Sequence, residues 1–272
     1  MILQTISQLK KYNFSNELKL YLMNYERIDL HRIYVFPYNI LVLVKTDDET
    51  FESYVRCQET GTRFKLEPGN YCFVPAGLSV EYCLRPNLTY YTFHVGLEVN
   101  PGIDLFSVCG DIETGNGEPW LTMVDEVYAE KDEFLALCRL RKTLLDFFIA
   151  HWPKAGFRSE PIPAEFRELM QDVKTRCDAT TTVESLAERM NMTPEAFSRK
   201  FRHLVDMTPK AFIMKCLSEK IIVQLCDSDK TLRQIAEELN FSSEFYCSRF
   251  FKKASGISPA AYKKMVRESA HS

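Results

Sequence analysis

Hydrophobic and polar residues change their spacing twice along the chain. Between residues 31 and 110, short segments rich in Val, Tyr, Phe and Thr alternate with turn residues, at the spacing of about 8 to 12 residues that is typical of a sandwich or barrel. The segments are HRIYVF, NILVLVKT, FESYVRC, TRFKL, NYCFVP, SVEYCL and LTYYTFHVGL. The pattern predicts an all-β module over about 25–110.

From residue 131 the period becomes that of a helix. Apolar residues recur at steps of three and four from Phe134 to Phe148, which predicts a helix over 131–152, within a helical part that begins near residue 120. The following stretch, 153–163, contains three prolines and a glycine. Because these residues interrupt regular structure, we expect a linker there, between an N-terminal domain of 1–152 and a C-terminal domain of 164–272.

The C-terminal domain has the start signals of several short helices. Thr181 and Thr231 are followed three residues later by Glu184 and Gln234, as in a capping box. Three further sites pair an N-cap hydroxyl with a proline at the first helical position: Thr193-Pro194, Thr208-Pro209 and Ser258-Pro259. After the second of them the pattern predicts one long helix, to about Cys226.

These helices repeat one pattern. Residues 186–195 match 235–244 at an offset of 49, and residues 198–212 match 248–262 at an offset of 50. We therefore expect one extra residue in the second copy, near 245–247. Two copies are too few for a solenoid, so the repeat indicates duplication of one supersecondary unit.

Each copy reads as a helix with a small Ala, a short turn at Asn and a second capped helix. This order resembles a helix-turn-helix, in which a small residue lets two helices cross closely. Asn191 and Asn240 suit the turns because Asn tolerates left-handed backbone. In the second helices we expect these residues to face the core: Phe197, Phe201, Leu204, Tyr246, Phe250 or Phe251, and Ala254.

The segments SLAERMNMTPEAFSRKFRHLVDMTPKAF and TLRQIAEELNFSSEFYCSRFFKKASGISPAAYKK resemble the AraC/XylS family of bacterial transcription regulators, over about 166–267. The resemblance implies two helix-turn-helix units whose second helices enter adjacent major-groove segments of double-stranded DNA. The helix between them, of about 18 residues, would span about 27 Å, close to the roughly 34 Å of one DNA turn. The implied DNA-binding residues are Glu195, Ser198, Arg199, Arg202, Ser243, Glu244, Phe245, Arg249, Lys252 and Lys253.

Two of these residues are the strongest candidates for reading bases. Arg199 and Arg249 each offer a guanidinium fork that can bond O6 and N7 of guanine together. The alternative for any one charge is a solvated helix face. Phe245 departs from the family pattern: it could contact thymine methyl groups if exposed, or pack inward in an adjusted register. Asn240 stands where the family often has Gly.

The segment LEPGNYCFVPAGLSVEY resembles the turn of cupin-like, jelly-roll sensor domains. The resemblance implies effector binding by the β-barrel and homodimerisation through the helix at 131–152. Tyr82, Tyr91 and His94 are candidate contacts for a sugar or another polar metabolite, with core packing as the alternative. Metal cupins have a His where this chain has Ser79 and Val80, so we expect no metal site and no cofactor.

Composition narrows the class of protein further. The nine cysteines contain no C-x-x-C pair, so we expect small buried hydrophobes rather than a disulfide framework or a zinc site. The sequence has no apolar run long enough for a membrane span and no signal peptide, which predicts a cytoplasmic protein without a membrane partner. From Glu165 onward, 18 Lys and Arg stand against 15 Asp and Glu; the preceding residues have 16 against 22. This asymmetry suggests two functions.

These observations together predict a transcription factor, not an enzyme, with no catalytic residues. It would bind promoter or operator DNA as a homodimer and respond to a small-molecule effector. An activator of this kind would also contact RNA polymerase. Two alternatives stay open: a DNA-binding regulator whose barrel serves for dimerisation alone, and a cupin enzyme with a helical appendage.

Overall fold

The computed structural model describes residues 17–26, 29–46, 52–151, 162–227 and 230–269. By internal contacts the chain forms two compact units. The described residues of 18–97 and 105–157 make a β-rich unit, and those of 158–265 make a helical unit together with residues 98–104. The expected linker falls largely on 152–161, outside the described residues, so the domain boundary stays a prediction.

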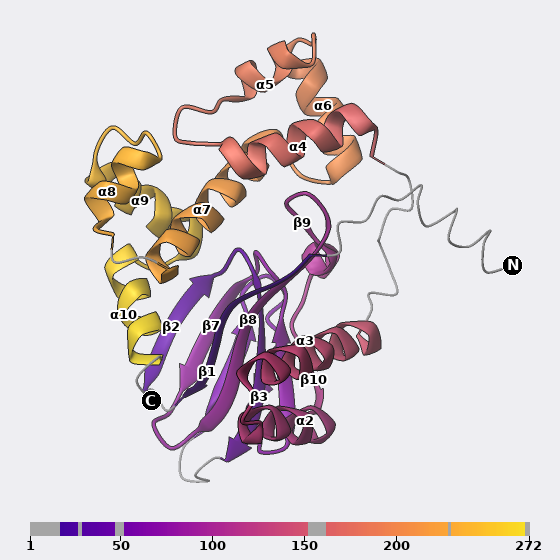
Figure 1. Cartoon of the computed structure of the whole chain (residues 1–272), viewed down its shortest axis with the longest axis vertical. Coiled ribbons are helices and arrows are strands. Elements are labelled where there is room, and N and C mark those ends of the chain that lie inside the picture. Colours follow the sequence, from indigo (N-terminus) through magenta and orange to yellow (C-terminus); the bar gives the residue numbers. More distant parts are fainter. Residues whose placement is uncertain (1–16, 27–28, 47–51, 152–161, 228–229, 270–272) are drawn as a thin grey trace, which may run out of the picture. The chain divides into compact units, whose positions relative to one another are not determined.

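The strands form two antiparallel sheets (Figure 1). The first sheet has the order β1-β8-β3-β6-β10, with β9 on β8, and the second has the order β2-β7-β4-β5. The strands are β1 (Glu17–Glu26), β2 (Leu30–Val35), β3 (Asn39–Thr46), β4 (Tyr54–Cys57), β5 (Arg63–Lys65), β6 (Asn70–Val74), β7 (Ser79–Leu84), β8 (Thr89–Asn100), β9 (Ile103–Asp104) and β10 (Glu113–Asn116). The expected β-rich fold is confirmed, as two sheets rather than one closed barrel.

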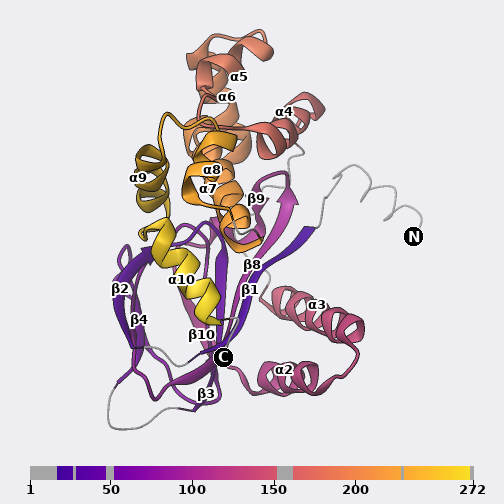
Figure 2. The same ribbon diagram turned by 60° about the vertical axis from the view of Figure 1, so that its left-hand side comes forward.

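Two helices cover one face of the first sheet (Figure 2). They are α2 (Glu118–Ala129) and α3 (Glu133–Ala150), and a short 3₁₀ turn at Leu105–Val108 precedes them. Phe147 of α3 lies 5.6 Å from Phe73 of β6 and 5.3 Å from Trp120 of α2, ring centre to ring centre. Because helices cover its outer face, β3 is buried from Asn39 to Val44 without alternation.

The helical unit contains two helix-turn-helix units joined by a long helix. Its helices are α4 (Ala164–Arg176), α5 (Val183–Arg189), α6 (Pro194–Val205), α7 (Pro209–Asp227), α8 (Leu232–Glu238), α9 (Glu244–Ser255) and α10 (Pro259–Ser269). The two units are α5–α6 and α8–α9. The connecting helix α7 has 19 residues, so it spans about 28 Å. This architecture confirms the predicted fold class.

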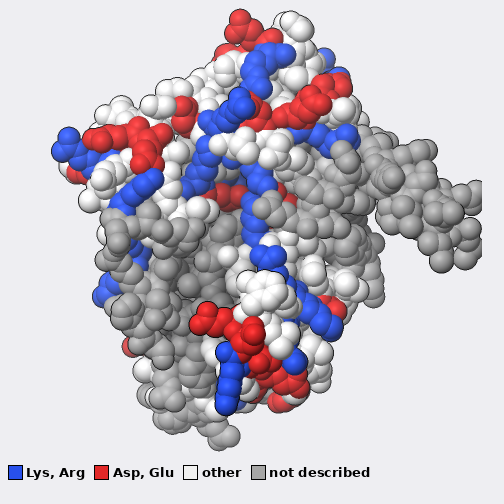
Figure 3. Space-filling model, in the orientation of Figure 1, with Lys and Arg blue, Asp and Glu red and all other residues white. Residues whose placement is uncertain are grey.

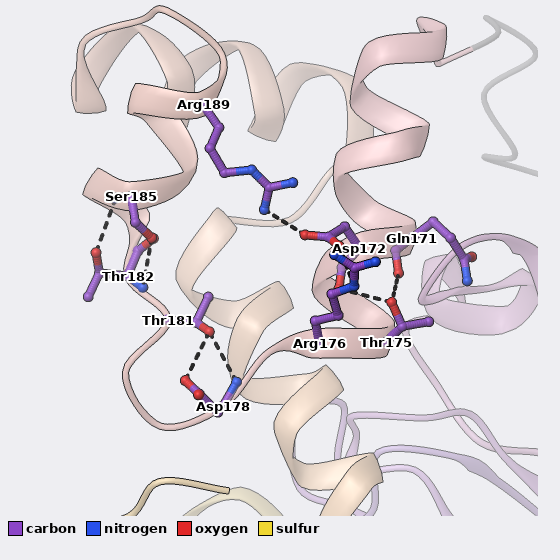
Figure 4. Close-up of polar contacts among 9 residues, drawn as sticks. All are labelled: Gln171, Asp172, Thr175, Arg176, Asp178, Thr181, Thr182, Ser185 and Arg189. Atoms are coloured by element: carbon purple, nitrogen blue, oxygen red, sulfur yellow. Dashed lines mark hydrogen bonds and ion pairs between the residues drawn. The ribbon is translucent and has the colours of Figure 1, made fainter.

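Capping side chains set the helix starts. Thr231 and Gln234 form the predicted capping box, and the hydroxyls of Thr193, Thr208 and Ser258 accept amides at the other predicted starts. The first box is shifted by one residue: it joins Thr182 and Ser185, whereas Thr181 accepts the amide of Asp178 (Figure 4). Thr181 and Thr182 are adjacent in the sequence, and either hydroxyl could cap α5. The prediction that Thr181 is the cap was wrong.

The hairpin tip at 98–104 is held in the helical unit by buried charges. Lys174 of α4 contacts the Glu98 carboxylate at 2.7 Å, and Lys215 of α7 donates to the Gly102 carbonyl at 2.7 Å. Glu98 is 2% exposed. Burying charges is costly unless they are paired in good geometry, so this network specifies the position of the tip on α4 and α7.

The eight cysteines whose side chains the structure describes are free thiols. Six are buried, as expected for small hydrophobes, whereas Cys109 is half-buried and Cys138 is exposed on α3. None of the helices in the described ranges is both long and apolar enough to cross a membrane.

Candidate DNA-binding interface

The second helices of the two units, α6 and α9, share one register. Thr193 caps α6 by accepting the amide of Ala196, and Ser243 caps α9 by accepting the amide of Tyr246. The buried residues of α6 are Phe197, Phe201 and Val205, and those of α9 are Cys247, Phe251 and Ser255. An offset of 50 residues therefore relates the two helices from cap to C-terminus.

This register corrects two expectations. The turns before the caps still match at an offset of 49, because Met192 donates to Ala187 and Phe241 donates to Ala236. The extra residue therefore lies at Ser242, between turn and cap, and not at 245–247. As a result Tyr246, which was expected in the core, is 46% exposed, and Cys247 takes the core position.

Half-buried residues flank both cores: Leu204 in α6, and Phe250 and Ala254 in α9. The ring of Phe250 lies 5.4 Å from Phe241 in the turn of its own unit. Phe251 is the fully buried aromatic of the pair and lies 5.7 Å from Tyr262. In the first unit, Phe201 contacts Phe212 in the same way, at 5.4 Å, so each second helix makes an equivalent aromatic contact with the helix that follows it.

On α6 the predicted contact residues lie mainly on the solvent face. Glu195, Arg199 and Arg202 are exposed, and Ser198 is half-buried. The neighbouring Lys200 is also exposed, but its ammonium lies 4.9 Å from the ring centre of Phe166 in α4. A cation over an aromatic face is stabilised there. The arginines of this helix are therefore better placed than Lys200 to meet a ligand.

The corresponding face of α9 is exposed as well. Arg249, Lys252 and Lys253 are exposed, and Phe245 is 73% exposed. The Arg249 guanidinium lies 5.9 Å from the ring centre of Tyr246. A cation is stabilised near an aromatic ring, so this contact favours a position of Arg249 beside the exposed rings of Phe245 and Tyr246. Glu244 is half-buried at the start of the helix.

Equivalent positions follow from the common register. Arg199 corresponds to Arg249, Arg202 to Lys252, and Ser198 to Ser248. Ser248 was not in the predicted set of DNA-binding residues, although the sequence repeat at an offset of 50 pairs it with Ser198. Ser243 itself uses its hydroxyl as the cap of α9. The exposed faces thus offer guanidinium forks for guanine, a carboxylate for cytosine N4 and an aromatic ring for thymine methyl groups.

The first unit is fixed to α4 by charged side chains (Figure 4). Arg189, in the last turn of α5, contacts the Asp172 carboxylate at 2.7 Å, and Arg176 contacts the same carboxylate at 3.2 Å. Over the helical unit, Lys and Arg side chains are interspersed with Asp and Glu (Figure 3). Because charges of both signs are mixed on this surface, it favours specific contacts over a uniform electrostatic attraction to DNA phosphates.

The β-rich unit brings two of the three candidate effector residues together. Phe36 lies 6.4 Å from the ring centre of Tyr82 and 5.7 Å from that of His94, and Tyr38 stacks on His94 at 4.9 Å. In the part of the chain that the structure describes, Tyr82 Oη and His94 Nδ1 are buried without a hydrogen-bond partner. Complete burial lowers the pKa of His94 to about 3, so its ring is neutral.

Tyr91 belongs to a different cluster. Its hydroxyl donates to Asp125 of α2 at 2.6 Å and accepts from Lys45 of β3 at 3.1 Å. Its ring stacks on Tyr128 at 4.9 Å. Burial and the bond to Asp125 raise the pKa of Tyr91. The cluster ties α2 to the sheet. Among the described residues, no group of three or more His, Cys, Asp and Glu side chains is arranged to hold a metal ion.

The fold and the paired exposed faces define a DNA-binding protein with two helix-turn-helix units. A family model described as a helix-turn-helix domain matches residues 186–265. The chain is 22% identical over 227 residues to the MmsAB operon regulatory protein of Pseudomonas aeruginosa, covering 79% of this chain and 72% of that protein. It is 32% identical over 83 residues to the transcriptional regulator AlkR of Acinetobacter baylyi, covering 30% and 27%.

The fold is also that of solved structures of ToxT from Vibrio cholerae. The chain resembles the apo form of a ToxT variant from Vibrio cholerae with a TM-score of 0.62 and 11% identity, covering 90% of this chain and 97% of that one. Wild-type ToxT with a bound unsaturated fatty acid gives a TM-score of 0.59 and 9% identity, covering 92% and 96%. The helix-turn-helix match and the named relatives support the resemblance of this chain to the AraC/XylS family of transcription regulators, and both relatives are named as regulatory proteins rather than enzymes.

Proposed function

We propose that this regulator, acting in the cytoplasm, places α6 and α9 in adjacent major-groove segments of one operator. The observation that carries the proposal is the common register of the two helices, which exposes Arg199 and Arg249 at equivalent positions. Both guanidiniums can then meet a base edge in the same way. Glu195, Ser198, Glu244 and Phe245 would lie beside them in the groove.

The remaining contacts in this proposal go to the DNA backbone. Arg202, Lys252 and Lys253 follow in the later turns of the two helices and are exposed. Contacts of this kind fix the orientation of a protein on DNA but carry no sequence information. Each phosphate neutralised releases bound counterions, so the affinity should fall as salt rises.

A DNA titration at several salt concentrations tests this proposal. The operator is first selected from a randomised duplex library, and the affinity for it is then compared with that for random DNA. We expect binding to both, with a negative salt slope, and tighter binding to the selected duplex. Binding to neither duplex, or equal affinity for both at every salt concentration, would contradict the proposal.

The β-rich unit is proposed to dimerise through α3. The helix buries Leu140, Leu144 and Phe148 on one face. Its opposite face carries an apolar stripe, formed by Phe134, Cys138, Leu145 and Ile149. Phe134 is 76% and Ile149 is 68% exposed. Exposed apolar side chains that gather on one helix face are typical of an interaction surface. Arg141 and Lys142 separate the two halves of the stripe, and a second copy of α3 offers matching apolar residues in each half.

The effector is proposed to bind at the aromatic cluster of Tyr82 and His94. Two buried polar atoms without partners each cost about 1–3 kcal/mol, which a ligand with matching hydrogen-bonding groups would offset. Because the His94 ring is neutral, it offers a hydrogen bond and no positive charge. The cluster therefore favours an uncharged polar molecule, such as a sugar. Tyr91 is satisfied by Asp125 and Lys45 and would contribute indirectly, through α2.

A fatty acid is the second candidate effector, because the similar fold of ToxT is known with an unsaturated fatty acid bound. Thermal unfolding with sugars, neutral metabolites and unsaturated fatty acids separates the two. A ligand that binds the folded state raises the melting temperature by mass action. A response to neutral polar compounds that Tyr82→Phe abolishes supports the first candidate. A response to fatty acids alone supports the second.

The alternative of a regulator whose β-rich unit serves for dimerisation alone predicts no response to any of these compounds. The enzyme alternative has no observation in its favour. If the protein activates transcription, RNA polymerase would be a further partner, and a pull-down with the polymerase holoenzyme on operator DNA tests that contact.

A further inference from the structure

The loop before the first helix-turn-helix unit contacts the turn of the second unit. The side-chain amide of Asn240, between α8 and α9, donates to Asp178 Oδ2 at 2.6 Å. Beside it, the backbone amide of Ala179 donates to the Leu239 carbonyl at 2.9 Å. The loop of residues 177–182 thus forms a second connection between the two helix-turn-helix units, in addition to α7.

The same loop is also bonded to the connecting helix. Lys220 of α7 donates to the Cys177 carbonyl at 2.7 Å. Because Cys177 directly precedes Asp178, one short stretch of backbone is held by α7 on one side and by the turn of the second unit on the other. Rotation of the α8–α9 unit about the end of α7 would break the bonds of Asp178 and Ala179.

The loop is preorganised for this contact. Asp178 Oδ1 accepts the amide of Thr180 at 2.8 Å and its hydroxyl at 2.6 Å, which leaves Oδ2 to accept from Asn240. Burial alone would raise the pKa of Asp178, but the hydrogen bonds from Thr180 and Asn240 outweigh it and lower the pKa. The acceptor is therefore a carboxylate, and hydrogen bonds to charged acceptors are the stronger kind.

The turn of the first unit provides an internal comparison. Asn191 holds the same place in its turn as Asn240 and has nearly the same backbone, with φ of 52° against 55°. Within the described ranges its exposed side chain makes no hydrogen bond to another element. Left-handed backbone alone therefore accounts for Asn191, whereas Asn240 also carries the bond to Asp178.

We propose that the Asp178–Asn240 contact fixes the placement of α9 relative to α6, and so determines which spacing between two half-sites the protein accepts. The inference rests on the proposed binding of both helices to one duplex. One inserted base pair moves the second half-site by about 3.4 Å and rotates it by about 35°. If both α7 and the Asp178–Asn240 contact hold the second helix-turn-helix unit, the unit resists this change in the position of its half-site. If α7 alone holds it, the unit can move with the half-site.

The test uses Asn240→Gly and Asn240→Asp, with Asn191→Gly and Asn191→Asp as matched controls. Gly accepts positive φ without strain, so Asn240→Gly removes the bond but keeps the turn. Asn240→Asp places a second carboxylate opposite Asp178. The two carboxylates repel each other, while the size and shape of the side chain at residue 240 stay nearly the same. Each full-length variant is measured on the selected operator and on duplexes with one base pair added or removed between the half-sites, and circular dichroism verifies folding.

We expect the wild-type protein and both Asn191 variants to discriminate strongly among the three duplexes. Asn240→Gly should reduce that discrimination by about threefold or more, and Asn240→Asp should reduce it further. Unchanged discrimination in the Asn240 variants, or equal losses in the Asn191 variants, would overturn the inference. If the wild-type protein protects one half-site alone, the proposed two-helix binding fails before the spacing is tested.

Discussion

Phe245 and Glu195 are equivalent residues of α9 and α6. Each is the second residue after its N-cap, Ser243 or Thr193, and each precedes the first core residue of its helix by two positions. The two helices therefore present the same scaffold and the same arginine, but an aromatic ring in one and a carboxylate in the other. This pair is one chemical difference between the two exposed faces; Ala196 and the 46% exposed Tyr246 are another.

Exchanging this pair should change the preferred base. With Phe245→Glu, the second half-site should shift from thymine toward cytosine at one position, because a carboxylate accepts from cytosine N4 and a ring contacts the thymine methyl. Each such change should alter the affinity by about 1–3 kcal/mol. Selection from a randomised library measures the shift. Phe245 is 73% exposed, so the melting temperature serves as the control and should not change.

Removal of either recognition arginine should weaken specific binding. We expect Arg199→Ala and Arg249→Ala each to cost about 1–3 kcal/mol on the operator and much less on random DNA. Arg202→Ala is the control for a phosphate contact, which should lose affinity on both duplexes and reduce the salt slope. Equal losses on the operator and on random DNA would assign Arg199 or Arg249 to the DNA backbone instead.

Much of the fold was predictable because its periodicity is strong. The segments NILVLVKT and SVEYCL match β3 and β7 residue for residue, and the proline-marked starts fix α6, α7 and α10. The strand β1 was missed, and α2 lies in the helical part that was predicted to begin near residue 120 but was not resolved as a separate helix; both carry usable signals. β1 alternates Leu18, Leu20 and Leu22, and α2 spaces Leu121, Val124 and Val127 by three. The strand β10, ETGN, has no hydrophobic pattern and is defined by pairing with β6.

The exposed faces were predictable as a set, but the register of α9 was not. Its sequence, EFYCSRFFKKAS, contains four aromatic residues, so two amphipathic registers compete on hydrophobicity alone. The structure selects the register with Ser243 as cap, which buries Cys247 and Phe251 and leaves Phe245 outside. The contact between Asp178 and Asn240 joins residues 62 positions apart, and no local pattern indicates it.

Charge on the apolar stripe of α3 should dissociate the proposed dimer. We expect Phe134→Glu and Ile149→Glu to yield monomers in sedimentation velocity, because each places a carboxylate in the dimer contact. Ile33→Glu on β2 is the control: this residue is 50% exposed but lies outside the stripe. Dimers that persist in both α3 variants, or dissociation by Ile33→Glu, would show that the interface lies elsewhere.

Burial of His94 should make folding sensitive to acid. Its folded-state pKa of about 3 lies below the roughly 6.5 of an unfolded chain. The stabilisation is therefore fully present above about pH 6.5 and is lost as the pH falls toward 3, at up to about 1.4 kcal/mol per pH unit. Urea unfolding between pH 7 and 5 measures this slope. His94→Phe should flatten it.

Removing one partner of the buried ion pair at the hairpin tip should destabilise the protein. Lys174→Met leaves the Glu98 carboxylate, which is 2% exposed, without its cation, at a cost of about 3 kcal/mol. Adding Glu98→Gln should recover much of that loss, because a neutral side-chain amide can still accept from the Gly102 backbone N–H, which donates to Glu98 Oε2 at 3.3 Å. Urea unfolding of the single and double variants gives the coupling. Additive losses would mean that the two residues act independently.

The central claim is that α6 and α9 read two different segments of one operator. Hydroxyl-radical footprinting of the wild-type protein, combined with base-preference mapping of Arg199→Ala and Arg249→Ala, tests it most directly. We predict two protected segments about one helical turn apart on the same face of the duplex, with Arg199→Ala relaxing the base preference in one and Arg249→Ala in the other. A single protected segment, or relaxation of the same base by both variants, would contradict the claim.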